Sequence, residues 1–165
     1  MSEPRPLDGR RAVVVTASTR AAQGVYPDRG GALIVETLRE WGAEVDDATV
    51  VADADVEEAL SAALAAQPDL LLTTGGTGIS PTDATPEATA PLLDRVMPGI
   101  AESIRAAGVA GGVPTAMLSR GLAGVAGRTL IINLPGSTGG VRDALSVLEP
   151  VLGHALSQIG GGDHT

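Results

Sequence analysis

Residues 70–89 read LLLTTGGTGISPTDATPEAT and hold a strand, a loop and a helix start in one stretch. The apolar run Leu70–Thr74 predicts a buried strand. A glycine-rich loop follows at once. Thr85-Pro86-Glu87 then predicts a helix start, because Thr can cap a helix, Pro suits the first helical position and an acid there favours the helix dipole. A strand that passes through a loop into a helix is the unit of an α/β sheet.

The rest of the chain repeats this alternation of strand and helix. Further strands are expected at 12–16, 44–51 and 129–134, and helices at 31–41, 56–66, 85–97, 100–107 and from about 141 onward. Loops are expected at 18–28 and 108–114, and a short strand with a turn within 116–125. We therefore predict an α/β fold with three layers: an open, mostly parallel sheet with helices on both faces. No repeat or linker divides residues 1–165, so we expect a single domain with its core at about 11–159, between a polar N-terminal tail and a glycine-rich C-terminal tail.

The composition narrows the chemistry that the chain can perform. Hydrophobic residues make up 44%, with one Trp, one Tyr and no Phe, which predicts an aliphatic core of the kind found around parallel strands. The net charge is −9 and no basic block occurs, so the electrostatic footprint of a nucleic-acid binder is missing. Cysteine is absent, which excludes disulfides, thiolate metal sites and a Cys nucleophile. The two histidines, His154 and His164, lie near the C-terminus, so any divalent metal would need oxygen ligands, which favours Mg²⁺. Without a signal-like or membrane-spanning segment, we expect a soluble cytoplasmic protein that binds no membrane.

The first candidate site is the loop Gly75-Gly76-Thr77-Gly78 after the strand that ends at Thr74. Ligands of open α/β sheets bind at the carboxyl ends of the strands, and glycine lets the backbone approach an anion closely. The hydroxyls of Thr74, Thr77, Ser80 and Thr82 add donors. The alternative is a tight turn that needs glycine for steric reasons alone. The loop is no Walker loop, because no Gly-Lys-Ser/Thr follows, and Pro81 stands where a dinucleotide fingerprint needs its third glycine.

Two acids are expected on the same rim of the sheet. Asp83 precedes the predicted helix and can either hold magnesium beside phosphates or serve as a turn aspartate. Asp53 follows the second predicted strand and has the look of an ordinary surface acid or helix cap. For Asp83, spacing alone leaves both the magnesium role and the turn role open.

A second loop, Asn133–Gly140 (NLPGSTGG), also joins a buried strand to a helix. Two such loops predict two anionic groups or two substrates. Arg142 falls in the first helical turn, where a cation is unfavourable, so either a bound anion or a nearby carboxylate would offset its charge. Ser119-Arg120 and Ser18-Thr19-Arg20 each add a hydroxyl and a guanidinium near a loop, with ordinary surface arginines as the alternative.

Three stretches together resemble a known family. TTGGTGISPTDATPEAT (73–89), LSRGLAGVAGRTLIINLPGS (118–137) and STRAAQGVYPDRGG (18–31) resemble the molybdenum-cofactor biosynthesis family of stand-alone Mog and MoaB type, which is related to the G domain of gephyrin. The resemblance covers about Arg11–Ile159. It implies a molybdopterin-binding α/β domain, usually a homo-trimer, that transfers AMP from Mg-ATP to the terminal phosphate of molybdopterin and releases pyrophosphate. It also allows handover of the product to a molybdenum-insertion protein.

The resemblance assigns roles to particular residues. Asp83 and Asp53 match the family's two aspartates, which implies that they act with magnesium in catalysis. Many relatives have Ser-Asp-Arg where this chain has Ser18-Thr19-Arg20. Substrate- or nucleotide-binding roles are implied for Thr74, Gly75, Gly76, Thr77, Gly78, Ser18, Arg20, Ser119, Arg120, Pro135, Gly136 and Ser137.

Two alternatives stay open within the same superfamily. One is a non-catalytic molybdopterin-binding or carrier protein of MoaB type. The other is a nucleotide pyrophosphatase of the competence-damage type.

Overall fold

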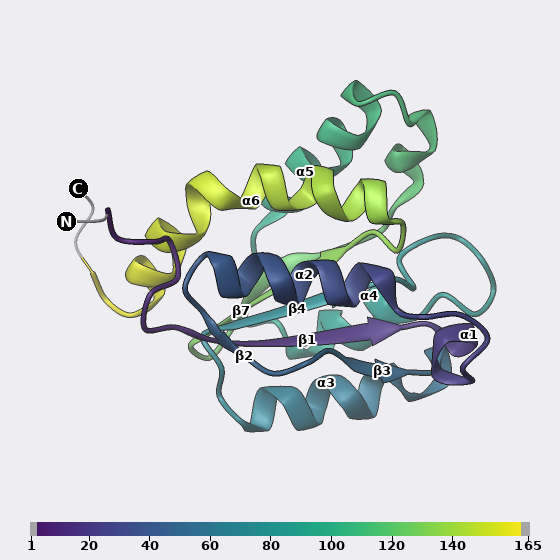
Figure 1. Cartoon of the computed structure of the whole chain (residues 1–165), viewed down its shortest axis with the longest axis horizontal. Helices are drawn as coiled ribbons and strands as arrows, with labels where there is room; N and C mark the ends of the chain where they lie inside the picture. Colours follow the sequence, from purple (N-terminus) through teal and green to yellow (C-terminus); the bar gives the residue numbers. More distant parts are fainter. Residues whose placement is uncertain (1–2, 163–165) are drawn as a thin grey trace.

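The structure is a computed structural model that describes residues 3–162 of the 165-residue chain. The outer ends of the two expected tails, with His164, lie outside the described residues. Figure 1 shows one twisted sheet with helices packed on both of its faces. The strands are β1 (Arg11–Ala17), β2 (Glu44–Val45), β3 (Thr49–Val51), β4 (Leu70–Thr74), β5 (Arg95–Val96), β6 (Ala123–Ala126) and β7 (Thr129–Leu134). The α-helices are α1 (Thr19–Ala22), α2 (Arg29–Glu40), α3 (Val56–Ala65), α4 (Thr85–Thr89), α5 (Pro98–Ala110) and α6 (Thr138–Ile159), and 3-10 helices span Asp53–Asp55, Ala90–Leu92 and Pro114–Leu118.

The sheet confirms the predicted fold class. Its strand order is β2-β1-β4-β7-β6-β5, and β3 also pairs with β1. β1, β2, β3, β4 and β7 run parallel, whereas β5 and β6 are antiparallel to their neighbours. Leu72 of β4 lies opposite Val14 of β1 on one side and Ile132 of β7 on the other. The three central strands therefore end at one common edge.

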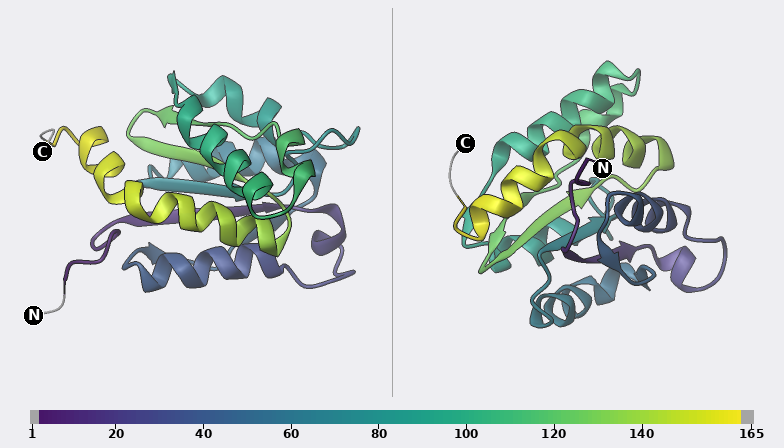
Figure 2. Two further views of the ribbon diagram at one scale, coloured as in Figure 1. Left: turned by 90° about the horizontal axis from the view of Figure 1, so that it is seen from above. Right: turned by 60° about the vertical axis from the view of Figure 1, so that its left-hand side comes forward.

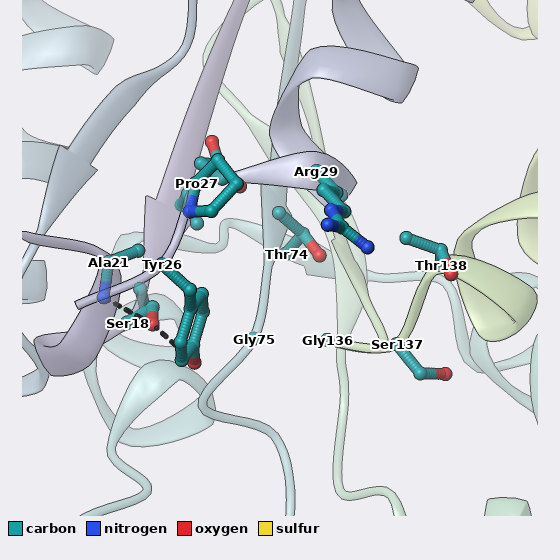
Figure 3. A pocket seen from close by; sticks show the side chains of 14 residues that line it. Ser18, Ala21, Tyr26, Pro27, Arg29, Thr74, Gly75, Gly136, Ser137 and Thr138 are labelled. Carbon is teal, nitrogen blue, oxygen red and sulfur yellow. Dashed lines mark hydrogen bonds between the residues drawn. The ribbon is translucent and has the colours of Figure 1, made fainter. Parts of the chain in front are cut away.

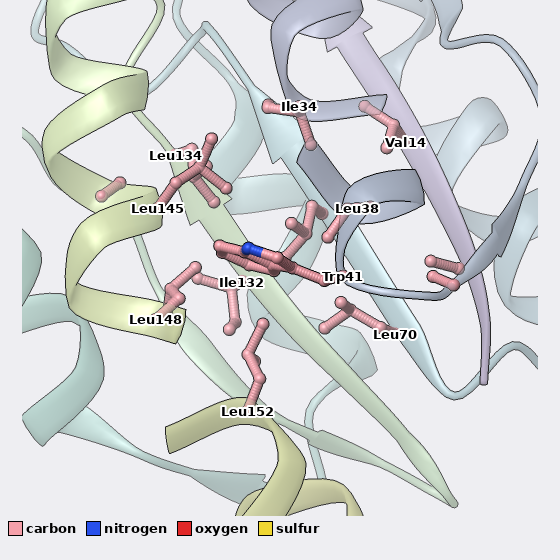
Figure 4. Packing of buried hydrophobic residues seen from close by; sticks show 14 of the residues in the cluster. Val14, Ile34, Leu38, Trp41, Leu70, Ile132, Leu134, Leu145, Leu148 and Leu152 are labelled. Atoms are coloured by element: carbon pink, nitrogen blue, oxygen red, sulfur yellow. The ribbon is translucent and has the colours of Figure 1, made fainter. Parts of the chain in front are cut away.

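The two faces of the sheet hold separate aliphatic clusters. Side chains alternate along each strand, so Leu70 and Leu72 of β4 belong to one cluster and Leu71 to the other. The first cluster lies under α2, α5 and α6, and the second under α3 and α4 (Figures 1 and 2). Trp41, 8% exposed, lies among leucines of β4 and α6 in the first cluster (Figure 4). The core is otherwise built from aliphatic side chains, as the composition predicts.

The helix predicted over 85–97 is much shorter than expected. α4 ends at Thr89 and continues as the 3-10 turn Ala90–Leu92, because Pro91 has no N–H to donate to the carbonyl four residues earlier. The chain then forms β5, a two-residue edge strand antiparallel to β6. Thr85 is no cap: it is fully buried in the first turn, and no side chain caps α4.

The bounds of other helices and strands also differ from the predicted ones. The strand predicted over 44–51 is two short strands, because the register against β1 shifts by one residue between Val45 and Thr49. The Arg39 guanidinium donates two hydrogen bonds to the Val45 carbonyl at the end of the first strand (3.1 and 2.9 Å). The loop predicted over 18–28 contains α1, and the 116–125 segment contains the end of a 3-10 helix before β6. Helices α5 and α6 begin earlier than predicted. Leu7, in the predicted N-terminal tail, is fully buried, and its N–H donates to the Trp41 carbonyl (2.8 Å).

Asn133 is a buried polar link between the layers. Its Nδ2 donates to the hydroxyls of Thr73 (3.0 Å) and Thr89 (3.1 Å), and its Oδ1 accepts the Leu122 N–H (3.0 Å). It therefore ties β7 to β4, to α4 and to the segment before β6. In the described part of the chain, none of the helices combines the length and apolar composition needed to cross a membrane.

Asn133→Ala should lower the free energy of unfolding by about 2–4 kcal/mol, because three hydrogen bonds are lost and their partners stay buried. Urea unfolding followed by circular dichroism measures the change. Ser146→Ala is the control: the Ser146 hydroxyl donates to the Arg142 carbonyl on the exposed side of α6 (3.1 Å), and its loss should cost less than about 0.5 kcal/mol. Equal losses for the two variants would contradict the prediction.

Candidate functional site

The carboxyl ends of β1, β4 and β7 border a cavity of about 720 Å³, the first cavity. Its lining includes Ser18 after β1, Thr74 and Gly75 at the end of β4, and Gly136 and Ser137 after β7. Figure 3 shows these segments around the space, with the loop before α2 above it. The two glycine-rich loops therefore meet here, and the 18–31 segment closes the third side.

Two long helices begin at the wall of the first cavity. Asp28 caps α2: its carboxylate accepts the Gly31 N–H (2.9 Å) and the Thr16 hydroxyl (2.8 Å). Ser137 caps α6 by accepting the Gly140 N–H (3.1 Å). The first N–H groups of a helix carry partial positive charge and favour anions. Both helix starts are therefore suited to phosphate.

Arg29 adds a full positive charge to the same wall. It is exposed, and no hydrogen bond or ion pair joins its guanidinium to another described residue. A cation in the first turn of α2 is unfavourable against the helix dipole, so a bound anion would relieve a cost that the protein alone leaves in place. Figure 3 shows the side chain reaching toward the space between Thr74 and Thr138. Arg142, for which the sequence leaves a bound anion or a carboxylate partner open, lines neither this cavity nor the second one described below.

The two glycines after β4 are required by the backbone. Gly75 and Gly76 have φ of +87° and +68°, a region that L side chains rarely adopt. A Cβ on Gly75 would overlap the Ala17 carbonyl oxygen, and one on Gly76 would overlap the Thr85 hydroxyl. Thr85 locks the turn, since its hydroxyl donates to the Gly75 carbonyl (3.0 Å) and its N–H to the Gly76 carbonyl (3.1 Å). Both positions therefore need glycine for steric reasons, whether or not a ligand binds, although Gly75 also lines the first cavity.

A second cavity of about 330 Å³ lies beside the first and shares Ser137 with it. Thr77, Gly78, Ser119 and Pro135 line it together with several aliphatic side chains. Two charged residues that the sequence analysis did not single out also face it. Arg105 donates to the carbonyls of Ser119 (3.3 Å) and Gly121 (3.1 Å), and Asp143 makes no hydrogen bond or ion pair with another described residue.

The two aspartates lie outside both cavity linings, Asp53 at the start of a 3-10 helix and Asp83 in the loop before α4. Asp53 accepts the Thr19 hydroxyl (3.1 Å), and its own N–H donates to that oxygen (3.1 Å). An aspartate at position 19 would instead place a second negative charge beside Asp53. Asp83 accepts the Ser80 N–H (3.0 Å), three residues earlier, and its own N–H donates to the Ser80 carbonyl (3.0 Å), so Asp83 closes this turn.

The donor chemistry of these aspartates suits magnesium only in part. Each carboxylate keeps one oxygen without a partner among the described residues. Within residues 3–162, however, no group of three or more Asp, Glu or His side chains is placed to hold a metal ion. Mg²⁺ is commonly held by one or two carboxylates plus substrate phosphates. Asp53 and Asp83 therefore form no preassembled metal cage, although each keeps a carboxylate oxygen of the type that Mg²⁺ prefers.

Arg120 fastens the glycine loop and lines neither cavity. Its Nε donates to the Gly78 carbonyl (2.9 Å), its Nη2 to the Asp83 carbonyl (3.3 Å), and its Nη1 pairs with Glu87. The hydrogen bond from this guanidinium holds the pKa of the Glu87 carboxyl below its usual range. Arg20 is exposed and also lines neither cavity. The two arginines proposed from sequence thus line neither cavity, whereas Arg29 lines the first and Arg105 the second.

Arg120→Lys should loosen the loop, because a lysine cannot reach both carbonyls and Glu87 at once. We expect amide hydrogen exchange over residues 78–83 to rise about tenfold, equivalent to ~1.4 kcal/mol. Glu87→Gln removes only the exposed ion pair and should change the same exchange rates less than about threefold. Unchanged exchange in Arg120→Lys would show that the loop holds its shape without the guanidinium.

Comparison with known proteins identifies the family. Residues 13–154 match the family described as a probable molybdopterin binding domain. The chain belongs to this family. It is 37% identical over 153 residues to the molybdopterin adenylyltransferase of Helicobacter pylori (strain J99), covering 90% of this chain and 86% of that protein. The Mog protein structure from Mycobacterium ulcerans matches with a TM-score of 0.87 and 57% identity, over 92% of this chain and 99% of the other.

Longer family members contain a matching region. The molybdenum cofactor biosynthesis bifunctional protein of Synechococcus elongatus is 42% identical over 160 residues, which is 96% of this chain and 50% of that protein. The chain therefore spans about half the length of the bifunctional relatives that it matches.

Proposed function

We propose that this family member is a molybdopterin adenylyltransferase, which transfers AMP from ATP to the terminal phosphate of molybdopterin and releases pyrophosphate. The observation that carries the proposal is a pair of unlike cavities that share the Ser137 wall. One is bordered by two helix starts and the cation Arg29, and the other is largely aliphatic. The names of the Helicobacter pylori relative and of the Mycobacterium ulcerans structure support this reading.

The first cavity is assigned to the nucleotide. ATP brings several negative charges to a protein of net charge −9, so its phosphates need local positive potential. The starts of α2 and α6 and the guanidinium of Arg29 supply that potential on one wall. A volume of about 720 Å³ lies in the range of small-ligand sites.

The second cavity is assigned to the pterin. A pterin is a flat heterocycle with polar edges, and a mostly aliphatic pocket with a few polar groups suits such a ring. The polar side chains of this cavity include Arg105, Ser119 and Asp143. The terminal phosphate of molybdopterin would then extend toward Ser137, which lines both cavities.

The reaction needs positioning more than acid–base chemistry. A phosphate oxygen of molybdopterin attacks the α-phosphorus of ATP, the new P–O bond forms, and the bond to the pyrophosphate oxygen breaks. No proton has to leave the attacking phosphate dianion, and no covalent enzyme intermediate is needed. The helix N–H groups, Arg29 and the Ser137 region would hold the two anions in line against their repulsion. Asp53 and Asp83 would hold Mg²⁺, which when bound neutralises charge on the phosphates.

The deciding experiment is incubation with molybdopterin and ATP, in magnesium and in chelator, with detection of adenylylated product and pyrophosphate. Product should form only with magnesium. Tight molybdopterin binding without pyrophosphate release would instead identify a carrier protein. Pyrophosphate-bond hydrolysis without molybdopterin would identify a nucleotide pyrophosphatase.

We further propose that the chain works as a single domain in a cytoplasmic homo-trimer, and that it hands its product to a molybdenum-insertion protein. Family membership supports these statements. Light scattering that shows a monomer at micromolar concentration would contradict the trimer.

A further inference from the structure

The chain places its single tyrosine at the first cavity. The sequence contains one Tyr, one Trp and no Phe, and Trp41 lies in the core. Tyr26 is 48% exposed and lines the cavity beside Pro27 and Ser18. A chain that builds its core from aliphatic residues has thus left its phenol ring half in solvent, at the mouth of the proposed nucleotide site.

The ring has a defined position. The hydroxyls of Tyr26 and Ser18 are 3.2 Å apart, and Ser18 is fixed because it caps α1 by accepting the Ala21 N–H (3.2 Å). The Val25 N–H donates to the Arg20 carbonyl (2.9 Å), which holds the turn that carries the ring. Tyr26 is therefore linked to the cap residue of α1 through its hydroxyl, and the residue before it is tied to α1 through its backbone N–H.

Charge divides the cavity into two ends. Figure 3 shows Tyr26, Ser18 and Pro27 on one side of the space and Arg29, Ser137 and Thr138 on the other. The start of α6 and the Arg29 guanidinium make the second side suitable for phosphates. The Tyr26 side holds no cation and offers an aromatic face, which suits a neutral nucleobase. The Asp28 carboxylate also lines the cavity, and it is engaged by the Thr16 hydroxyl and the Gly31 N–H.

We infer that Tyr26 is the base-stacking residue of this site and makes it selective for purine nucleotides. The base lies on the Tyr26 ring, and the phosphates extend toward Arg29 and α6. This inference rests on the proposed function, since it assigns the base end of the nucleotide. Stacking scales with overlapped ring area, so a purine gains more than a pyrimidine, whereas adenine and guanine are not distinguished by the ring alone.

A single tyrosine makes the contact directly observable. Protein labelled with ¹³C-tyrosine gives ring signals from Tyr26 alone, and a stacked purine shifts them upfield through its ring current. The probes are α,β-methylene-ATP, which cannot transfer AMP, the matching CTP analogue, and inorganic tripolyphosphate. We expect a clear upfield shift with the ATP analogue, a smaller one with the CTP analogue and none with tripolyphosphate.

Affinity provides the second measurement. Tyr26→Ala should weaken the affinity for the ATP analogue by about 5- to 150-fold, the equivalent of ~1–3 kcal/mol for one stacked base. It should leave the affinity for tripolyphosphate unchanged. Tyr26→Phe keeps the ring and should bind within about threefold of wild type. Val25→Ala is the matched control, because Val25 is 64% exposed and does not line the cavity.

The outcomes separate this inference from the proposed function. If the ATP analogue binds but the Tyr26 signals stay unshifted, or if Tyr26→Ala binds it as wild type does, the stacking role is overturned and the adenylyltransferase proposal stands. Equal affinity for the ATP and CTP analogues overturns purine selectivity. A Tyr26→Phe variant as weak as Tyr26→Ala would make the hydroxyl the contact and overturn stacking. If neither the ATP analogue nor tripolyphosphate binds, with or without molybdopterin, the stacking role and the adenylyltransferase proposal are both overturned.

Discussion

Asp83→Asn should lower the rate of adenylyl transfer by about 10²–10³-fold and leave the protein folded. The asparagine oxygen can still accept the Ser80 N–H, and the Asp83 carbonyl still receives the Arg120 guanidinium, so the turn keeps its shape. The variant loses the negative charge, and with it most of the affinity for a hard cation. Pyrophosphate release measures the rate, and thermal melts check the fold.

Two further variants sharpen this result. Asp53→Asn should act in the same way, and the double variant should be little worse than either single one if both carboxylates hold one ion. Asp94→Asn is the control, because the Asp94 carboxylate also accepts a backbone N–H, from Gly127 (2.7 Å), but lies with Asp69 and Thr129 near the amino ends of β4 and β7, whereas both cavities border their carboxyl ends. It should keep wild-type turnover. Near wild-type turnover by Asp83→Asn would mean that this aspartate is only a turn residue.

Gly76→Ala should abolish tight ligand binding and lower the free energy of unfolding by about 2–4 kcal/mol. Two costs add: a side chain at φ +68°, and overlap of its Cβ with the Thr85 hydroxyl that locks the turn. Urea midpoints and titrations with ATP and molybdopterin measure the two effects.

Two other glycines separate the causes. Gly127 has φ +59° with open space around its Cβ position, so Gly127→Ala isolates the backbone cost and should lose about 1 kcal/mol. Gly78 lacks positive φ, but its Cβ would lie 2.8 Å from an Asp83 carboxylate oxygen. Gly78→Ala should therefore have a larger effect on the rate of adenylyl transfer than on the free energy of unfolding. A Gly76→Ala variant no less stable than Gly127→Ala would remove the role assigned to Thr85.

The buried strands could be predicted from the residues that form them. The predicted bounds of β4, Leu70–Thr74, and β7, Thr129–Leu134, match the structure, because apolar runs of this length carry their own signal of burial. The short edge strand β5 carries no such signal, since both of its residues are exposed and its pairing with β6 depends on the tertiary fold. The α2 boundary could have been set earlier, since Asp28 is a cap residue type just before Arg29.

The sequence by itself determined the fold class, the family and the two glycine loops, because hydrophobic pattern and loop motifs are local properties of the chain. Only the tertiary structure decided which side chains border the cavities. Arg120 turns to carbonyls 42 and 37 positions away, and Asp53 bonds Thr19 at a separation of 34. Arg29 and Tyr26 face the first cavity because the segment between α1 and α2 folds over the strand ends. Such contacts join residues that are distant along the chain, so no local pattern records them, and packing of the elements brings them together.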